Sequence, residues 1–270
     1  METDYEILRI QIEGMYDVQN IRFGTNNQIR SYLRRFLLGL GFKGKKKDET
    51  DSVEWNDEEI RKMLQLALKK KKIEQERYDV MINVLSEADK YKELEKELER
   101  KIEPILKKEP IWQKWLINVK GINTRSVARL LKNYEYCERF DNVAKLWAYS
   151  GYHVVDGHAV KPVKGQKLNY NARAKTDMFV VGECLIRASS SYKQFYNKVK
   201  LGYQNNPIHI EKTKLHIHRM SMRKMIKLFL SHYWYVTRTL KGLPTRIPYA
   251  VEYLGHTTII EPYEFKPEQI

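Results

Sequence analysis

The sequence has few of the features that mark secreted, membrane-spanning or metal-binding proteins. Only two cysteines, Cys137 and Cys184, occur in 270 residues, which is too few for a disulfide framework and typical of a reducing compartment. The apolar runs are too short for a transmembrane helix, and we expect no secretory leader. Neither C-x-x-C nor H-E-x-x-H spacing occurs, so we expect no metal site and no cofactor.

Acidic residues are scarce in the second half of the chain. Residues 1–110 hold 23 Lys and Arg against 23 Asp and Glu, whereas residues 111–270 hold 26 against 11, so the net charge of +15 lies entirely there. Between residues 158 and 227, 15 bases face three acids. Charge this one-sided is typical of polyanion binding, and we interpret this half as a nucleic-acid-binding region of a cytoplasmic, nucleoid-associated protein.

The chain shows the spacing of apolar residues, three and four apart, that indicates helices. We expect helices at residues 4–40, 57–108, 112–131, 143–149, 173–187 and 213–240. Three glycines with alternating Val and Lys predict a small β-hairpin or an ordered loop within residues 151–170. The predicted fold class is therefore mainly α, with at most a small β-hairpin.

Three regions are expected along the chain: a helical and coiled-coil region (1–110), a basic DNA-binding domain (111–241) and an extended proline-rich tail (242–270). The first region contains an apolar stripe at spacings of three and four, made of Met81, Val84, Ala88, Tyr91, Leu94, Leu98, Ile102 and Ile105. Such a stripe suits a helix packed within its own domain, an antiparallel hairpin or an intermolecular coiled coil. We expect a homodimer formed through residues 57–108.

A helix–hairpin–helix pattern is expected at residues 119–130, where a glycine-containing turn separates two helical segments. Such a turn presents backbone N–H groups and a helix N-terminus to a phosphate. Gly121 permits close approach of the backbone, and Asn123 tolerates positive φ. The predicted contacts are Lys120, Gly121, Asn123, Arg125, Arg129 and Lys132. We expect a bulky residue at Gly121 to weaken DNA binding and to leave the fold intact.

Two further groups of bases extend the predicted DNA-binding surface. One lies in the loop and the helix start after residue 160, where bases alternate with aromatic residues, and comprises Lys161, Lys164, Lys167, Arg173 and Lys175. The other follows one face of the last helix and comprises Arg219, Arg223, Lys224 and Lys227. Contacts from such residues to phosphates position a duplex without reading its sequence.

The stretch from Leu116 to Ala188 resembles the C-terminal domain of the IS-one-ten group of insertion-sequence transposases, the serine recombinases guided by a bridge RNA. The matching elements are Val119–Asn123, Arg139–Asp141, Lys145–Gly151 and the basic loop with the helix from Arg173. Residues 21–30 are similar to the helix that precedes that domain, and residues 57–108 resemble the family's coiled-coil linker. The resemblance implies a helix–hairpin–helix domain and a DNA partner.

Two departures from the family pattern imply that catalysis has been lost. No strand-rich segment precedes residue 110, so the family's RuvC-like nuclease domain is not expected in this chain. No serine occurs between Gly151 and Ala188, where the resemblance would place the nucleophile. We therefore expect no catalytic residue, and a DNA-binding relative that recognises duplex or branched DNA with little base specificity.

Two alternatives to this interpretation stay open. An active recombinase, either of the tyrosine type or one that works with a partner nuclease, is indicated by His216 and Arg219 in H-x-x-R spacing, with His256 and Tyr263 after them. Structured RNA is the competing ligand, because a basic surface by itself does not distinguish the two nucleic acids.

Overall fold

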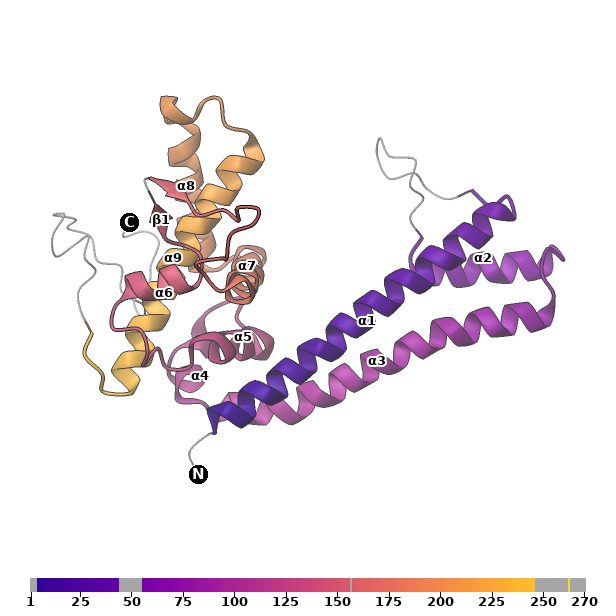
Figure 1. The fold of residues 1–270 in the computed structure, drawn as a ribbon, viewed down its shortest axis with the longest axis horizontal. Coiled ribbons are helices and arrows are strands. Elements are labelled where there is room, and N and C mark those ends of the chain that lie inside the picture. The colour runs from indigo at the N-terminus through magenta and orange to yellow at the C-terminus, as the bar shows by residue number, and fades with distance from the viewer. Residues whose placement is uncertain (1–3, 44–54, 156, 246–261, 263–270) are drawn as a thin grey trace. The chain divides into compact units, whose positions relative to one another are not determined.

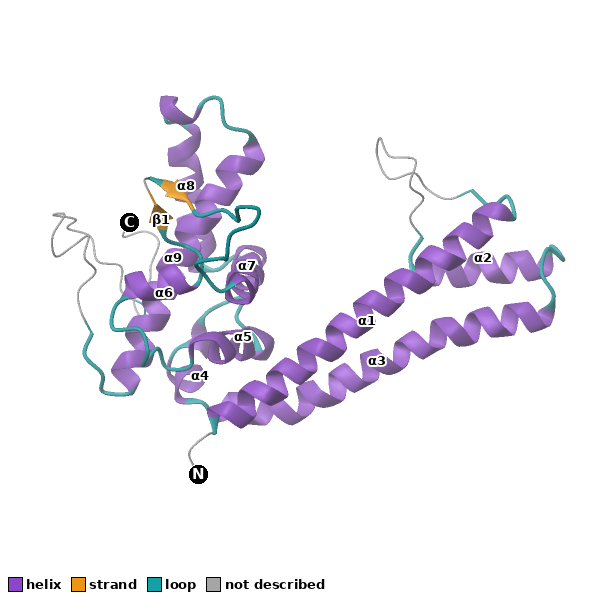
Figure 2. Ribbon diagram, in the orientation of Figure 1, coloured by secondary structure: helices purple, strands orange, loops and turns teal. Residues whose placement is uncertain are grey.

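The computed structural model describes residues 4–43, 55–155, 157–245 and 262. The chain falls into two compact units, which we name the hairpin unit (Ile10–Ile102) and the basic unit (Met1–Arg9 with Glu103–Ile270). The described residues are mainly helical and contain one two-stranded sheet, which confirms the predicted fold class (Figures 1 and 2). Within them, no helix combines the length and the apolar composition that crossing a membrane requires.

The hairpin unit is built from three helices, α1 (Tyr5–Gly39), α2 (Asp57–Lys69) and α3 (Gln75–Lys108), of which α1 begins and α3 ends in the basic unit. The Asn56 side chain caps α2 by accepting a hydrogen bond from the Glu59 N–H at 2.9 Å. The Glu59 carboxylate accepts one from the Asn56 N–H at 2.8 Å, which completes a capping box. These two bonds fix where α2 begins.

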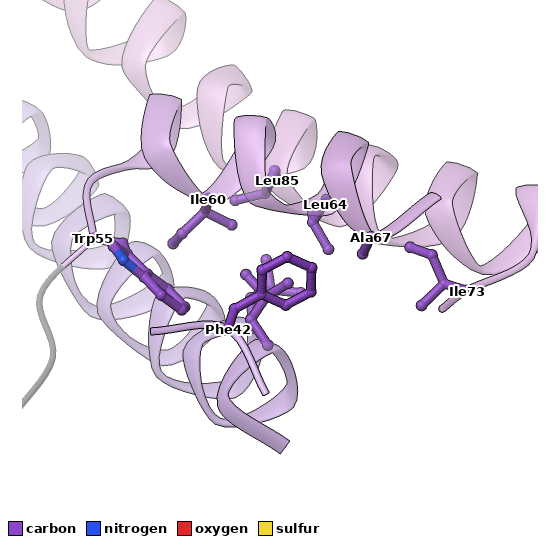
Figure 3. Packing of buried hydrophobic residues seen from close by; sticks show 9 residues of the cluster. Phe42, Trp55, Ile60, Leu64, Ala67, Ile73 and Leu85 are labelled. Atoms are coloured by element: carbon purple, nitrogen blue, oxygen red, sulfur yellow. The ribbon is translucent and has the colours of Figure 1, made fainter. Parts of the chain in front are cut away.

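A buried apolar cluster holds α2 against α1 and α3 (Figure 3). Ile60 and Leu64 of α2 are fully buried, and they pack with Leu37 of α1 and Leu85 of α3. Trp55, which precedes α2, belongs to the same cluster. Burial of large apolar side chains at about 1.5–3 kcal/mol each is the main source of stability for this end of the unit.

The helix α3 packs through a face that coincides with the predicted stripe only in part. Its buried residues in this unit include Leu85, Glu95 and Ile102, whereas Val84 and Leu94 are each 42% exposed. Glu95 is only 3% exposed, and it accepts hydrogen bonds from Arg22 and Gln19 of α1 at 2.8 and 2.7 Å. A buried carboxylate paired in this way fixes the register of the two helices.

The basic unit surrounds α9, which packs against α4, α6, α7 and α8. Its elements are α4 (Pro110–Lys114), the 3₁₀ helix η1 (Leu116–Asn118), α5 (Thr124–Tyr134), α6 (Val143–Tyr149), β1 (Val154–Val155), β2 (His158–Ala159), α7 (Ala172–Arg187), α8 (Ser191–Gln204), the 3₁₀ helix η2 (Pro207–His209) and α9 (Lys214–Leu240). The antiparallel strands pair Val154 with Ala159 and Val155 with His158, so the hairpin expected within residues 151–170 is present.

Aromatic side chains of α9 fill the core of the basic unit. Phe229 stacks on Trp115 with ring centroids 5.7 Å apart, and the indole N–H of Trp234 donates to the Phe140 carbonyl at 2.7 Å. Arg238 is nearly buried and donates to the carbonyls of Cys137 and Phe140, both at 3.2 Å. These bonds tie α9 to backbone carbonyls of the segment between α5 and α6.

The glycine-containing turn expected between two helical segments is present, and α8 was not predicted. The turn separates η1 from α5, and its Gly121 adopts φ +93°. Three consecutive serines, residues 189–191, favour a loop, but Ser190 caps α8 by accepting from the Lys193 N–H at 3.2 Å. Apolar burial of Tyr192, Phe195 and Tyr196 then holds that helix in the fold.

Candidate nucleic-acid interface

The hairpin turn at residues 119–123 packs tightly on α7. A β-carbon built on Gly121 would lie 2.7 Å from the Cys184 carbonyl oxygen and 2.9 Å from the Ala188 β-carbon. The expectation that a bulky residue here leaves the fold intact is therefore wrong, because both the positive φ and the contact exclude a side chain.

Asn123 has a structural role in the same turn. Its φ is −125°, so it does not use the positive-φ conformation expected of it. Its side-chain oxygen accepts from the Ser126 N–H at 2.9 Å and thereby caps α5. Lys120 is the predicted base that this turn leaves exposed.

The bases of α5 are engaged within the protein. Arg129 Nε lies 3.1 Å and Lys132 Nζ 2.7 Å from the carboxylate of Asp177 on α7, with side chains only 14% and 10% exposed. Asn133 donates to the same carboxylate at 2.9 Å. Arg125 is half-buried and also has an interaction partner. The prediction that Arg129 and Lys132 contact DNA is therefore corrected, because both side chains form ion pairs with Asp177 that join α5 to α7.

The loop between β2 and α7 presents its lysines to solvent. Lys161, Lys164 and Lys167 are all exposed. The loop ends at Asn171, whose backbone N–H donates to the Tyr149 carbonyl at 2.8 Å and whose side-chain amide donates to the Tyr149 hydroxyl at 2.7 Å. A loop fixed in this way holds its ammonium groups over one part of the surface.

Bases of α7 and α9 lie beneath this loop and support it. Arg223 of α9 donates to the carbonyls of Gly151 and His153 at 3.2 and 2.5 Å, so it holds the residues that lead into β1. Lys175 of α7 lies 4.3 Å from the centroid of the Tyr170 ring, and its Nζ is 3.4 Å from the Val160 carbonyl. Arg223 thus supports the fold more than it faces solvent: its guanidinium donates to backbone carbonyls, and burial lowers its pKa.

The neighbouring turn of α9 carries a second aromatic–base pair. Lys227 Nζ lies 3.8 Å from the centroid of the Trp147 ring, and the indole N–H donates to the Lys227 carbonyl at 3.1 Å. Burial lowers the pKa of Lys227, and the charges of Arg223 and Lys224 lower it further. Lys224 and Arg219 are exposed on the same helix.

These observations define a lysine-loop patch, the surface formed where the loop, the start of α7 and the middle of α9 meet. Its exposed members are Lys161, Lys164, Lys167, Arg173 and Lys224. The positive charges of Arg223, Lys175 and Lys227 all lower the pKa of His153, together with its burial as the largest cause. The patch thus concentrates charge on a fixed surface, as a polyanion-binding site requires.

The hairpin turn and the lysine-loop patch lie at opposite ends of α7. Gly121 packs at Cys184 and Ala188 near the C-terminal end of that helix, whereas Lys175 lies in its first turns. The two places are about 14 Å apart along the helix axis. The predicted contact residues therefore form two separate groups, with Lys120 at one and the patch at the other.

A cavity of about 260 Å³ lies beside the hairpin turn and was not predicted. Trp115 and Tyr192 form its buried part. Its polar lining comprises Lys114, Asn118, Lys120, Ser189, Ser191 and Gln194. The only hint of this cavity in the sequence was the run of serines at residues 189–191. These serines lie next to Lys120 only because of where α8 packs in the fold.

The groups that could carry catalysis or bind a metal were also located in the structure. Among the residues that the structure describes, no three His, Cys, Asp or Glu side chains gather as a metal site would require. The Ser150 hydroxyl is buried and bonded to Leu146 and Tyr134, and burial raises the pKa of the Cys137 thiol to about 12. His216 is exposed on α9, whereas His256 and Tyr263 lie outside the described residues.

The chain was also compared with known proteins. No family model, no curated protein and no solved structure matches this chain.

Proposed function

We propose that this protein binds double-stranded or branched DNA through backbone phosphates, with little reading of the bases and without cutting the strands. The observation that carries the proposal is the lysine-loop patch. Its lysines are exposed on a loop whose backbone is tied to Tyr149 at one end, so several positive charges are available to a ligand at one surface.

The position of the acidic residues supports this proposal. Asp177, the acid closest in sequence to Arg173 and Lys175, is turned toward Arg129 and Lys132. Glu183 lies near His218 and Arg187, with oxygen–nitrogen distances of 3.9 Å to each. Both carboxylates thus lie beside other basic groups of the protein, outside the exposed members of the patch.

The residue types favour phosphate contact over base recognition. Lysine presents a compact charge on a flexible stem, which binds phosphate without the two-pronged geometry that arginine offers to guanine. Three of the four exposed bases beside Arg173 in the patch are loop lysines, and Arg223 is occupied with the carbonyls of Gly151 and His153. The loss of catalysis rests on the absence of a serine between Gly151 and Ala188, and it belongs to the same proposal.

The test is a salt titration by fluorescence anisotropy of labelled duplex, four-way junction and structured RNA, with Mg²⁺ present and the strands then run on a denaturing gel. We compare the wild type with Lys161→Gln/Lys164→Gln/Lys167→Gln. The matched control is Lys69→Gln/Lys70→Gln/Lys71→Gln, which removes the same charge from exposed lysines of the hairpin unit.

We expect tight DNA binding whose logarithm falls linearly with the logarithm of salt, and intact strands on the gel. The loop variant should lose about 0.9 from the slope for each phosphate contact removed, whereas the control should keep the wild-type slope. Equal slopes for the two variants would contradict the assignment to the loop. Stronger binding of RNA, or cleaved strands, would replace the proposal with the corresponding alternative.

A further inference from the structure

The helix α3 carries two apolar faces, and α1 and α2 cover one of them. Leu85 belongs to the cluster with α2, and Glu95 is bonded to α1. The second face begins at Val80, which is 57% exposed, and continues through Val84 and Leu94, each 42% exposed. A fully polar face would be expected on a helix that packs only within its own unit.

We name the second face the outer stripe. It follows spacings of four and three along α3 and comprises Val80, Val84, Glu87, Tyr91, Leu94, Leu98 and Lys101. Tyr91 and Leu98 are half-buried, and the two charged members are exposed. Alternating spacings of four and three are the a and d positions of a coiled coil, so the stripe suits the side of another helix.

The charges within the outer stripe select the direction of that helix when it is a second copy of α3. In a parallel pair, Glu87 would face Glu87 of the other copy, and Lys101 would face Lys101. In an antiparallel pair in which Tyr91 meets Leu94 of the other copy, Glu87 comes near Lys101. The two central Tyr91–Leu94 layers are then apolar, and they are flanked by layers that pair Glu87 with Leu98 and Val84 with Lys101. Like charges directly opposed are destabilising, so the antiparallel direction is favoured.

The flanking charges fix the register of the antiparallel pair. Lys90 and Glu97 lie next to the stripe on the side away from Glu95. In the register above, Lys90 lies opposite Glu97 of the other copy, and this pair occurs twice by symmetry. Moving one copy by a heptad would oppose Lys90 with Lys90 in one direction and Glu97 with Glu97 in the other. One register thus combines apolar layers with opposite charges.

We propose that the protein forms a homodimer in which the outer stripes of two α3 helices pair antiparallel, centred between Lys92 and Glu93. This inference is independent of the proposed function, because it rests on the hairpin unit and involves no residue of the lysine-loop patch.

Disulfide cross-linking tests the direction. In a Glu87→Cys/Leu98→Cys variant, the two thiols are about 16 Å apart within one helix, too far to bridge, but they adjoin each other across the antiparallel pair. Mild oxidation should convert this variant to a covalent dimer, whereas wild type, which carries only Cys137 and Cys184, reports the background. Cross-linking of the single Glu87→Cys variant above that background would show a parallel pair and overturn the proposal.

Sedimentation equilibrium tests the surface and the register. Val84→Glu/Leu94→Glu should raise the dimer dissociation constant about 100-fold or more, whereas Ile208→Glu/Ile210→Glu, which changes two isoleucines 80% and 82% exposed in the basic unit, should not. Lys90→Glu should also weaken the dimer, and adding Glu97→Lys should restore it. A monomeric wild type at tens of micromolar, or no restoration in the double variant, would refute the pairing.

Discussion

A β-carbon built on Gly121 would come within 2.7 Å of the carbonyl oxygen of Cys184, because the hairpin turn lies directly on α7. That contact makes the turn a packing element of the basic unit in addition to any role at a phosphate. A substitution at Gly121 therefore tests stability before it tests binding.

We predict that Gly121→Ala destabilises the protein by about 2 kcal/mol or more, since it adds a backbone clash to the strain of a positive φ. Urea unfolding followed by circular dichroism measures this loss. Gly165→Ala is the matched control, because Gly165 also has positive φ, +82°, but nothing lies within 4 Å of an added β-carbon. It should cost about 1 kcal/mol. Equal losses for the two variants would contradict the close contact at Cys184.

The junction of α5 and α7 should depend on Asp177. Replacing it by Asn leaves Arg129 and Lys132 nearly buried without their carboxylate, and we expect a loss of about 2 kcal/mol. The same unfolding measurement applies. As a control, Glu58→Gln removes the partner of Lys62 in a pair whose side chains are 76% and 66% exposed, and the unfolding midpoint should hardly change. A midpoint for Asp177→Asn that matches the control would show that the junction does not rely on the ion pairs.

The stability of the basic unit should fall in mild acid through His153. Burial, with the charges of Arg223, Lys175 and Lys227, lowers the pKa of His153 below its ordinary value of 6.5. As the pH falls through 6.5, the unfolded chain therefore takes up a proton that the folded protein resists, and unfolding becomes easier until the lower, folded-state pKa is passed. Above pH 6.5 His153 is neutral in both states and the folded protein keeps its full stability. As the pH falls below 6.5, the free energy of unfolding decreases.

Thermal unfolding between pH 7.5 and 5 measures this effect in wild type and in His153→Asn. We expect the midpoint of the variant to fall less steeply over this range, since the asparagine side chain does not titrate. His216→Asn is the control, because that histidine is exposed on α9. A slope for His153→Asn equal to that of the wild type would exclude His153 as a source of the pH dependence.

Much of the secondary structure could be predicted from the sequence. The interval 143–149 was predicted as a helix with the bounds that α6 has, and the first and last long helices differ from their predictions by one residue at an end. These helices carry strong periodicity and clear caps, which are local signals. Two segments differ: residues 57–108 are divided into α2 and α3 by a turn between Lys69 and Gln75, and α8 depends on a serine cap whose effect is decided by packing.

The sequence by itself determined the helical class and the place where positive charge accumulates, because periodicity and composition are properties of neighbouring residues. Only the tertiary structure decided which of those charges face solvent. Asp177 lies 48 positions from Arg129 in the chain, and folding alone brings them together. The same holds for α3, where the packing of α1 and α2 on one face leaves the outer stripe uncovered. Charge is additive along a sequence, whereas its neutralisation requires contacts between residues far apart in it.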